Sequence, residues 1–202
     1  MTDLSIDTND APEPLTDGRR RRGQANRDAI VHAMMSLAEA GEVMPSAAKV
    51  AELAGVGLRT VYRHFDDLDS LYREMSGIVR KDLEPILADD FEGPDVHARL
   101  DLLIRRRVVV FERVMPLKIA GNIRRFSSDF IMSDYEDQLR MEEEGLRCAL
   151  AIVDDLDNEL FESLRVATSF QCWRGLRLDH GLGVDEATKV MRRLVKALSV
   201  DL

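Results

Sequence analysis

The residues whose types and spacing best suit ligand chemistry lie in the predicted short helix Leu58 to Phe65. Arg59 and Arg63 are four residues apart, so their side chains share one helix face. Guanidinium groups on one face can donate paired hydrogen bonds to guanine or grip phosphates. Three further donors flank them, namely Thr60, Tyr62 and His64. This face therefore fits the major groove of DNA.

The preceding residues supply what such a helix needs to pack against a second one. Ser46 is placed to cap a helix whose apolar face comprises Ala47, Val50, Ala51 and Ala54. Gly55 allows the positive φ of a tight interhelical turn, and Val56 can fill the space beneath that turn. Val61 and Phe65 are also four residues apart and can pack inward. The block Ser46 to Phe65 therefore predicts a helix-turn-helix.

This block resembles the signature of the TetR family of transcription regulators, in which a small-residue turn leads into a recognition helix ending in Tyr-x-His-Phe. The resemblance spans Arg27 to about Leu71. It implies phosphate contacts from Thr60, Tyr62 and His64. It implies base contacts from the exposed positions Leu58, Arg59 and Arg63. It also implies a homodimer that pairs the last two helices of each subunit, and a ligand pocket enclosed by the middle helices.

The resemblance thus implies a ligand-responsive regulator, usually a repressor, that binds a palindromic operator and is released by a small-molecule effector. Two positions depart from the family. Gly57 stands where serine commonly opens the recognition helix, and Leu68 stands where a phosphate-binding lysine commonly opens the next helix. Three acids surround Leu68, namely Asp66, Asp67 and Asp69. A helical interaction protein with a degenerate helix-turn-helix that no longer binds DNA is therefore the alternative.

Four adjacent arginines precede the first predicted helix. Such a run stays solvated, either as an arm without a partner or as an arm that contacts phosphates or the minor groove. Because Leu68 removes the expected lysine contact, we expect the arginines to carry more of the DNA affinity. The full predicted DNA-contacting set is Arg19, Arg20, Arg21, Arg22, Ser46, Gly57, Leu58, Arg59, Thr60, Tyr62, Arg63 and His64.

Charge is distributed unevenly along the chain, whose formal net charge is -9. Counted by segment, residues 1–16 carry -4, residues 17–65 carry +3 and residues 66–202 carry -8. A single basic segment on an acidic chain indicates a DNA-contacting end and a body that does not bind DNA. We therefore divide the chain into a disordered tail and basic arm (1–23), a helix-turn-helix domain (24–67) and a ligand-binding and dimerisation domain (68–202).

The sequence predicts an all-α fold of about nine helices. Apolar residues recur at helical spacing, and no segment sustains the two-residue alternation of a half-buried strand. The expected helices are Asn26 to Gly41, Ala47 to Ala54, Leu58 to Phe65, Leu68 to Leu83, Val96 to Met115, Pro116 to Gly121, Ser128 to Val153, Asn158 to His180 and Asp185 to Leu198.

The last two predicted helices carry more apolar surface than one subunit's core requires. The final helix has a stripe of Ala187, Val190, Met191, Leu194, Val195 and Leu198. The helix before it is apolar on more than one side, with Leu160, Phe161, Leu164, Ala167, Phe170, Trp173 and Leu176. We interpret the excess as a homodimer interface, because two-fold symmetry matches two operator half-sites. A thick core within one subunit is the alternative.

Two charged residues interrupt apolar stripes in the C-terminal part. Arg107 shares a stripe with Leu103 and Phe111, and Glu142 falls on a stripe of a later helix. The commoner arrangement keeps the arginine stem on apolar surface and its head in water. The alternatives are a buried Arg107–Glu142 pair or a pocket in which these groups orient a ligand. The candidate ligand-binding residues are Arg107, Phe111, Tyr135, Glu142, Phe170 and Trp173, with Met141 as a further wall residue.

Other chemistry finds little support in the sequence. Cys148 and Cys172 are widely spaced in apolar patterns, and His32, His97 and His180 lack partners at metal spacing, so we expect no disulfide, metal or cofactor. No nucleophile elbow or phosphate loop is present, so a small helical enzyme using Arg107 and Glu142 is the remote alternative. The absence of a long apolar run and of a signal peptide predicts a cytoplasmic, nucleoid-associated protein without membrane contact.

Overall fold

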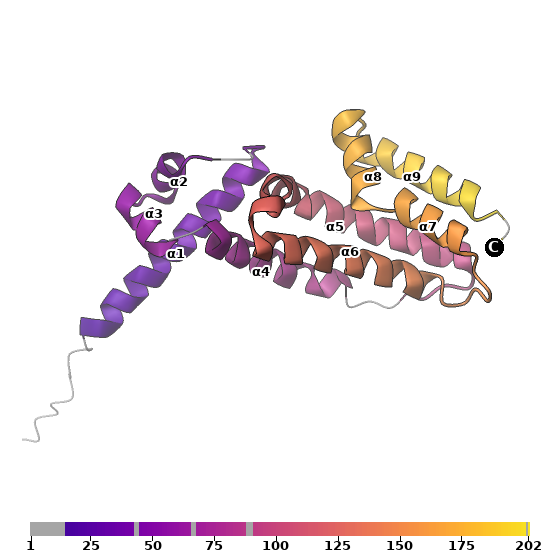
Figure 1. Cartoon of the computed structure of the whole chain (residues 1–202), viewed down its shortest axis with the longest axis horizontal. Coiled ribbons are helices and arrows are strands. Elements are labelled where there is room, and N and C mark those ends of the chain that lie inside the picture. Colours follow the sequence, from indigo (N-terminus) through magenta and orange to yellow (C-terminus); the bar gives the residue numbers. More distant parts are fainter. Residues whose placement is uncertain (1–14, 43–44, 66–67, 88–90, 201) are drawn as a thin grey trace, which may run out of the picture.

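The computed structural model describes residues 15–42, 45–65, 68–87, 91–200 and 202 of the chain. Every regular element in these residues is helical, which confirms the predicted all-α class. A group of helices at one end, α1 to α3, adjoins a longer group formed by α4 to α9 (Figure 1). No helix in the described ranges is long and apolar enough to cross a membrane.

The first helix begins earlier than predicted. α1 spans Leu15–Glu39, whereas the apolar pattern placed its start at Asn26. The arginine run therefore lies on a helix and not in an extended arm. Arginine favours helices almost as strongly as leucine does, so α1 continues beyond its apolar face. The predicted disordered tail falls mainly on residues 1–14, which lie outside the described residues.

The helices α2 (Ala47–Ala54) and α3 (Leu58–His64) form as predicted and pack on α1. The hydroxyl of Ser46 accepts a hydrogen bond from the backbone N–H of Lys49 at 3.3 Å and caps α2. Gly55 ends α2 at φ +65°, the left-handed conformation that a residue without Cβ adopts most readily. Together with the start of α4 the three helices bury one apolar core, comprising Ile30, Val31, Ala33, Met34, Leu37, Val50, Ala51, Val61, Phe65, Leu71 and Met75.

The middle of the chain forms three long helices, α4 (Leu68–Leu87), α5 (Val96–Arg124) and α6 (Asp129–Ala149), with a short 3-10 turn η1 (Arg125–Ser127) before α6. α5 runs through Pro116, so the separate helix predicted between Pro116 and Gly121 does not exist. Buried residues on both sides of the proline, Met115 and Ala120, hold the helix together by packing. Asp66 and Asp67, two of the three acids around Leu68, lie outside the described residues.

The C-terminal helices also differ from the prediction. The expected helix from Asn158 to His180 is divided into α7 (Asn158–Ala167), α8 (Phe170–Arg174) and the π-turn η2 (Gly175–Asp179), and α9 (Val184–Leu198) follows. The break lies where Thr168 turns its hydroxyl back onto the carbonyl of Leu164 and Ser169 caps α8 through the N–H of Cys172. Local hydrogen bonds of this kind compete with a continuous helix.

A second core joins α5, α6, α7, α8 and α9. Its buried residues include Leu100, Leu103, Ile104, Phe111, Leu146, Phe161, Leu164, Phe170, Trp173, Ala187, Met191 and Val195. Most of the apolar residues that the sequence assigned to a dimer interface are therefore buried within one subunit. The exposed remainder is smaller and includes Leu194, which is 41% exposed, and Leu198, which is 36% exposed.

Candidate functional site

The outer face of α3 carries the predicted polar group. Arg59, Tyr62 and Arg63 are exposed, with Tyr62 at 60%, whereas Val61 and Phe65 are buried in the core against α1 and α2. Leu58, the other predicted base-contacting residue, is also exposed. Thr60 and His64 are half-buried at the edges of this face. The helix therefore presents its polar side chains outward because its apolar side chains are buried.

The N-cap residues of the two short helices differ in their bonding. The Ser46 hydroxyl caps α2, whereas Gly57 begins α3 without a side-chain hydrogen bond. The glycine therefore is the weaker cap that its type predicts. Both residues are exposed.

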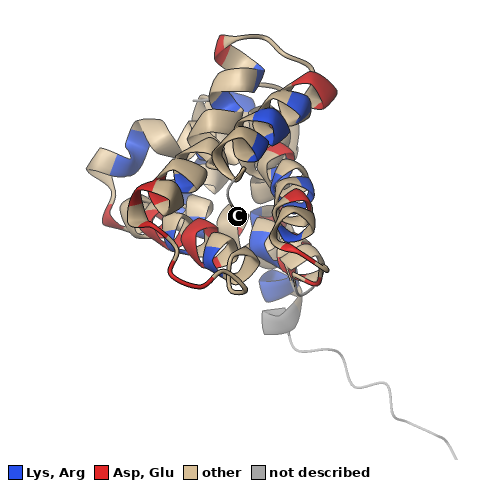
Figure 2. Ribbon diagram, turned by 90° about the vertical axis from the view of Figure 1, so that its right-hand side faces the viewer, with Lys and Arg blue, Asp and Glu red and all other residues tan. Residues whose placement is uncertain are grey.

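The helical extension of α1 brings part of the arginine run to the end of α3. Arg19 and Arg22, three residues apart on α1, line a shallow depression together with Gly23, Asn26, Arg63 and His64. We call Arg19, Arg22, Arg63 and His64 the basic cluster. Basic residues gather at the N-terminal end of α1 (Figure 2). Arg20 and Arg21 do not line the depression. The cluster offers several cationic donors to one anion.

Arg27 fixes the end of α3 against α1 and α4. Its guanidinium donates to the backbone carbonyl of His64 at 3.0 Å, forms an ion pair with Glu74 of α4 and lies 4.6 Å from the centre of the Phe65 ring. Burial lowers the pKa of the His64 imidazole, and the positive charges of Arg63 and Arg27 lower it further. The lowered pKa favours the neutral form of the His64 imidazole at neutral pH. No role for Arg27 was predicted, because a single arginine on a helix has no distinguishing pattern.

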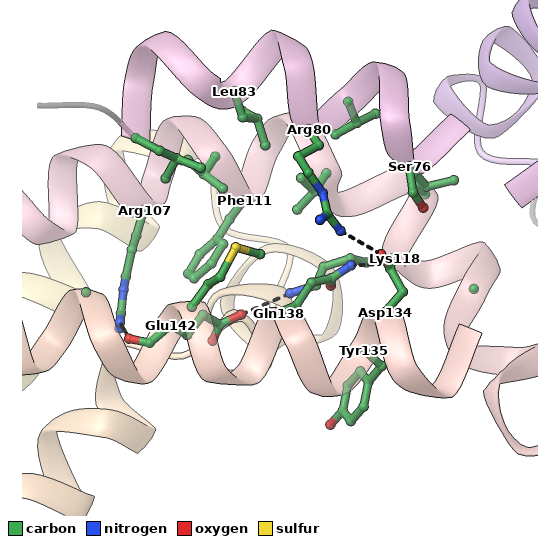
Figure 3. Close-up of a pocket in the computed structure, with 18 of the residues that line it drawn as sticks. Ser76, Arg80, Leu83, Arg107, Phe111, Lys118, Asp134, Tyr135, Gln138 and Glu142 are labelled. Atoms are coloured by element: carbon green, nitrogen blue, oxygen red, sulfur yellow. Dashed lines mark hydrogen bonds and ion pairs between the residues drawn. The ribbon is translucent and has the colours of Figure 1, made fainter. Parts of the chain in front are cut away.

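A pocket of about 380 Å³ lies among α4, α5 and α6. Four of the predicted ligand-binding residues line it, namely Arg107, Phe111, Tyr135 and Glu142, and Met141 lines it as well. Figure 3 shows Ser76, Arg80 and Leu83 of α4 above the pocket and the side chains of α6 below it. The volume falls within the range of small-molecule sites in proteins.

Phe170 and Trp173, two of the predicted ligand-binding residues, do not line this pocket. Both are buried in the second core, where Phe170 meets Phe111 edge to face at 5.5 Å. The indole N–H of Trp173 donates to Glu112 at 2.8 Å, and Arg177 pairs with the same carboxylate. The hydrogen bond from Arg177 is the main cause that lowers the pKa of Glu112.

The pocket wall contains a buried ion pair that sequence reasoning did not find. Lys118 Nζ lies 2.9 Å from Glu142 Oε1, and both side chains are largely buried. The other carboxylate oxygen accepts the backbone N–H of Phe170 at 3.1 Å, and the ammonium lies 4.1 Å from the Phe170 ring centre. Burial lowers the pKa of Lys118, and the Glu142 carboxylate opposes that shift. Lys118 follows Pro116 in the segment that the sequence assigned to a separate short helix.

Arg107 is 5% exposed, so its head is not in water as the commoner arrangement would have it. The guanidinium donates to the backbone carbonyl of Thr168 at 2.7 Å, to the Thr168 hydroxyl and to the backbone carbonyl of Glu142. The predicted alternative of a buried Arg107–Glu142 pair therefore identified two residues that do interact, but Arg107 binds the backbone carbonyl of Glu142 and not its carboxylate. Burial lowers the pKa of Arg107 to about 10. Arg107 fastens α5 to α6 and to the end of α7.

A second polar contact spans the pocket from α4 to α6. Arg80 Nη2 lies 3.3 Å from Asp134 Oδ1, and Gln138 donates to the other oxygen of Asp134 at 2.7 Å (Figure 3). Burial raises the pKa of Asp134, and the positive charge of Arg80 opposes that shift. None of these residues was predicted to bind a ligand, because each is a single polar residue on a long helix.

Metal chemistry finds no support within the described residues, because they contain no group of three or more histidine, cysteine or acidic side chains that could hold an ion. Cys148 and Cys172 are free thiols in this structure. Burial raises the pKa of Cys172, which keeps it protonated and unreactive at neutral pH.

No family model and no curated protein matches this chain. The resemblance to the TetR family therefore rests on the residues from Arg27 to Leu71 and stays a prediction.

Proposed function

We propose that this protein is a ligand-responsive, DNA-binding transcription regulator that acts as a homodimer. In this proposal α2 and α3 form the helix-turn-helix, α3 enters the major groove, and the pocket among α4, α5 and α6 receives the effector. The observation that carries the proposal is the division of α3 into a buried apolar face and an exposed face bearing Arg59, Tyr62 and Arg63. The family resemblance implies that the regulator represses transcription.

The homodimer is supported by the apolar residues that remain exposed on α9. Leu194 and Leu198 are one turn apart, and the half-buried Val190 continues the same stripe. On α7, Val166 is 66% exposed. Apolar side chains repeated along one helix face favour burial against a partner. A second copy of the chain would place two α3 helices on one DNA molecule.

A physical link between the pocket and α3 supports ligand response. α4 supplies pocket residues, including Arg80 and Tyr72, and its Glu74 pairs with Arg27, which in turn holds the end of α3. A ligand that shifts α4 would therefore shift α3. A difference of about 1 to 3 kcal/mol in ligand affinity between the two arrangements is sufficient for regulation.

Selection of genomic fragments by the purified full chain tests the proposal. We expect retention of a small set of fragments that share an inverted repeat, with half-site centres about one helical turn, roughly 34 Å, apart or a multiple of it. Retention of all fragments alike, or of none in low salt, would contradict sequence-specific binding. The second outcome would favour the helical interaction protein.

The basic cluster includes only two of the four arginines in the run Arg19 to Arg22, so we expect their replacements to affect DNA binding unequally. We expect the double change Arg19→Ala and Arg22→Ala to weaken operator binding and to reduce the slope of log affinity against log salt by about 1.8, roughly 0.9 for each lost phosphate contact. Arg20→Ala, which removes one charge where the double variant removes two, is the control: the sequence placed Arg20 in the DNA-contacting set, but Arg20 is exposed on the same helix and does not line the depression. Fluorescence anisotropy with labelled operator at several salt concentrations measures the slope. An equal loss in the control and the double variant would refute a specific role for the cluster.

A further inference from the structure

Polar residues gather toward one end of the pocket, whereas apolar residues line it along its whole length. The end nearer α1 to α3 holds Ser76, Arg80, Lys118, Asp134, Tyr135 and Gln138 (Figure 3), and the pocket is also lined by Asn122 at the C-terminal end of α5 and by Arg125, which directly follows α5. Farther along α4 and α5 the lining includes Leu83, Leu87, Val110 and Leu103. The site therefore suits a molecule with one polar head and an apolar body, whose head faces the N-terminal helices.

The charges that line the pocket are unequal. Five basic residues, Arg80, Arg106, Arg107, Lys118 and Arg125, face three acidic residues, Asp134, Glu142 and Glu144. At the polar end, the basic residues Arg80, Lys118 and Arg125 outnumber the acidic Asp134, and they still do so when Glu142, the ion-pair partner of Lys118, is counted. A low-dielectric pocket with excess positive charge favours an anion over a neutral or cationic ligand.

Lys118 has hydrogen-bonding capacity that the protein does not use. Its ammonium group has three N–H donors, and within the described residues one oxygen, Glu142 Oε1, accepts from it. The remaining close contacts are with the rings of Phe170 and Phe111, at 4.1 and 5.8 Å. A buried cation with free donors at a pocket wall forms strong, charge-assisted hydrogen bonds with an anionic acceptor.

Arg125 adds a second unsatisfied donor at the same end. Its Nη1 donates to Asn122 at 3.0 Å and its guanidinium lies 4.3 Å from the Tyr135 ring centre. Its Nε is buried and has no hydrogen-bond partner among the described residues. Buried donors are rarely left without a partner unless a ligand or water supplies one.

We propose that the pocket binds an apolar carboxylate, with its carboxylate oxygens on Lys118 Nζ and Arg80 and its apolar body against Leu83 and Phe111. The inference rests on the proposed function only in treating the bound molecule as an effector. Arg80 also pairs with Asp134 across the pocket, so a ligand carboxylate competes with Asp134 for the same guanidinium. The carboxylate thereby loosens one of the contacts between α4 and α6.

Calorimetric titration of the full chain with three probes of equal carbon number tests this ligand class. The probes are decanoate, decanol and decylamine, which differ in head-group charge. We expect decanoate to bind at least about tenfold more tightly than either of the others, because hydrogen bonds to charged groups are the strong ones. Equal affinity for decanol, or tightest binding of decylamine, would overturn the proposal.

Two variants locate the head group. Lys118→Met is expected to weaken decanoate about tenfold and to leave decanol unchanged. Arg80→Gln is expected to lower the affinity for decanoate by about threefold, a smaller effect because the Arg80 side chain is 57% exposed. This variant tests the position of the carboxylate if Lys118→Met does not fold. Arg140→Gln is the control, because Arg140 is an exposed arginine of α6 that pairs with Asp137 and lies outside the pocket lining. Unchanged decanoate binding in the folded variants would overturn the proposed position of the carboxylate.

The titration contains no DNA, so its outcome is independent of the fragment selection. Decanoate binding without specific DNA retention would contradict the transcription regulator and leave the ligand class standing. Specific DNA retention without a preference for decanoate would contradict the ligand class alone.

Discussion

Replacing Arg107 with Met is expected to lower the free energy of unfolding by about 3 kcal/mol, the largest effect of any single change on stability that we predict. Methionine fills a similar volume but donates no hydrogen bond. The change therefore leaves the backbone carbonyls of Thr168 and Glu142 buried without the donor that they share. Urea denaturation followed by circular dichroism measures the loss.

Arg105→Met is the matched control for that experiment. Arg105 lies on the same helix, is exposed and pairs with Asp101 one turn away. Exposed pairs of this kind contribute little, so we expect a change within about 0.5 kcal/mol. If the two variants lost equal stability, the hydrogen bonds of Arg107 would not be what holds α5, α6 and α7 together.

The second large effect concerns DNA recognition, where Arg59→Ala and Tyr62→Phe are expected to behave differently. Arg59 is exposed near the start of α3, so its loss is expected to cost about 1 to 3 kcal/mol and relax the base preference at one position of each half-site. Tyr62→Phe removes one hydroxyl that is expected to bind phosphate, so it weakens all sequences alike. Competition assays with every base at each operator position measure both.

Arg165→Ala provides a control for nonspecific charge loss in the same assays. Arg165 lies on α7, far along the chain from α3, and pairs with Glu162. Its removal should leave the operator preference intact. Identical specificity profiles for Arg59→Ala and Tyr62→Phe would contradict the division of α3 into a base-reading residue and a phosphate-binding residue.

Local signals in the sequence predicted the N-terminal unit well. Ser46 and Gly55 act within a few residues of themselves, so the cap and the turn that they form follow from residue type. The spacing of Val61 and Phe65 likewise determined which face of α3 is buried. The start of α1 was missed because the arginine run has helix propensity without an apolar face, and apolar periodicity was the signal used.

Long-range contacts account for the errors in the C-terminal body. Pro116 normally ends a helix, but packing of Met115 and Ala120 overrides that tendency. Consequently the segment carrying Lys118 was assigned to a separate helix, and its pairing with Glu142 was not foreseen. Helical periodicity shows that a residue points inward but not which neighbour it meets. The sequence therefore predicted that Arg107 lies on an inward-facing stripe, but not that its guanidinium binds backbone carbonyls.

The position of Trp173 has a practical consequence for spectroscopy. It is the single tryptophan of the chain, it is fully buried, and its indole N–H is bonded to Glu112 in the second core. The core formed by α1, α2, α3 and the start of α4 contains no tryptophan. Intrinsic fluorescence excited at the indole band therefore reports on the C-terminal body alone. A difference between the fluorescence and circular dichroism transitions would reveal that the two ends of the molecule unfold separately.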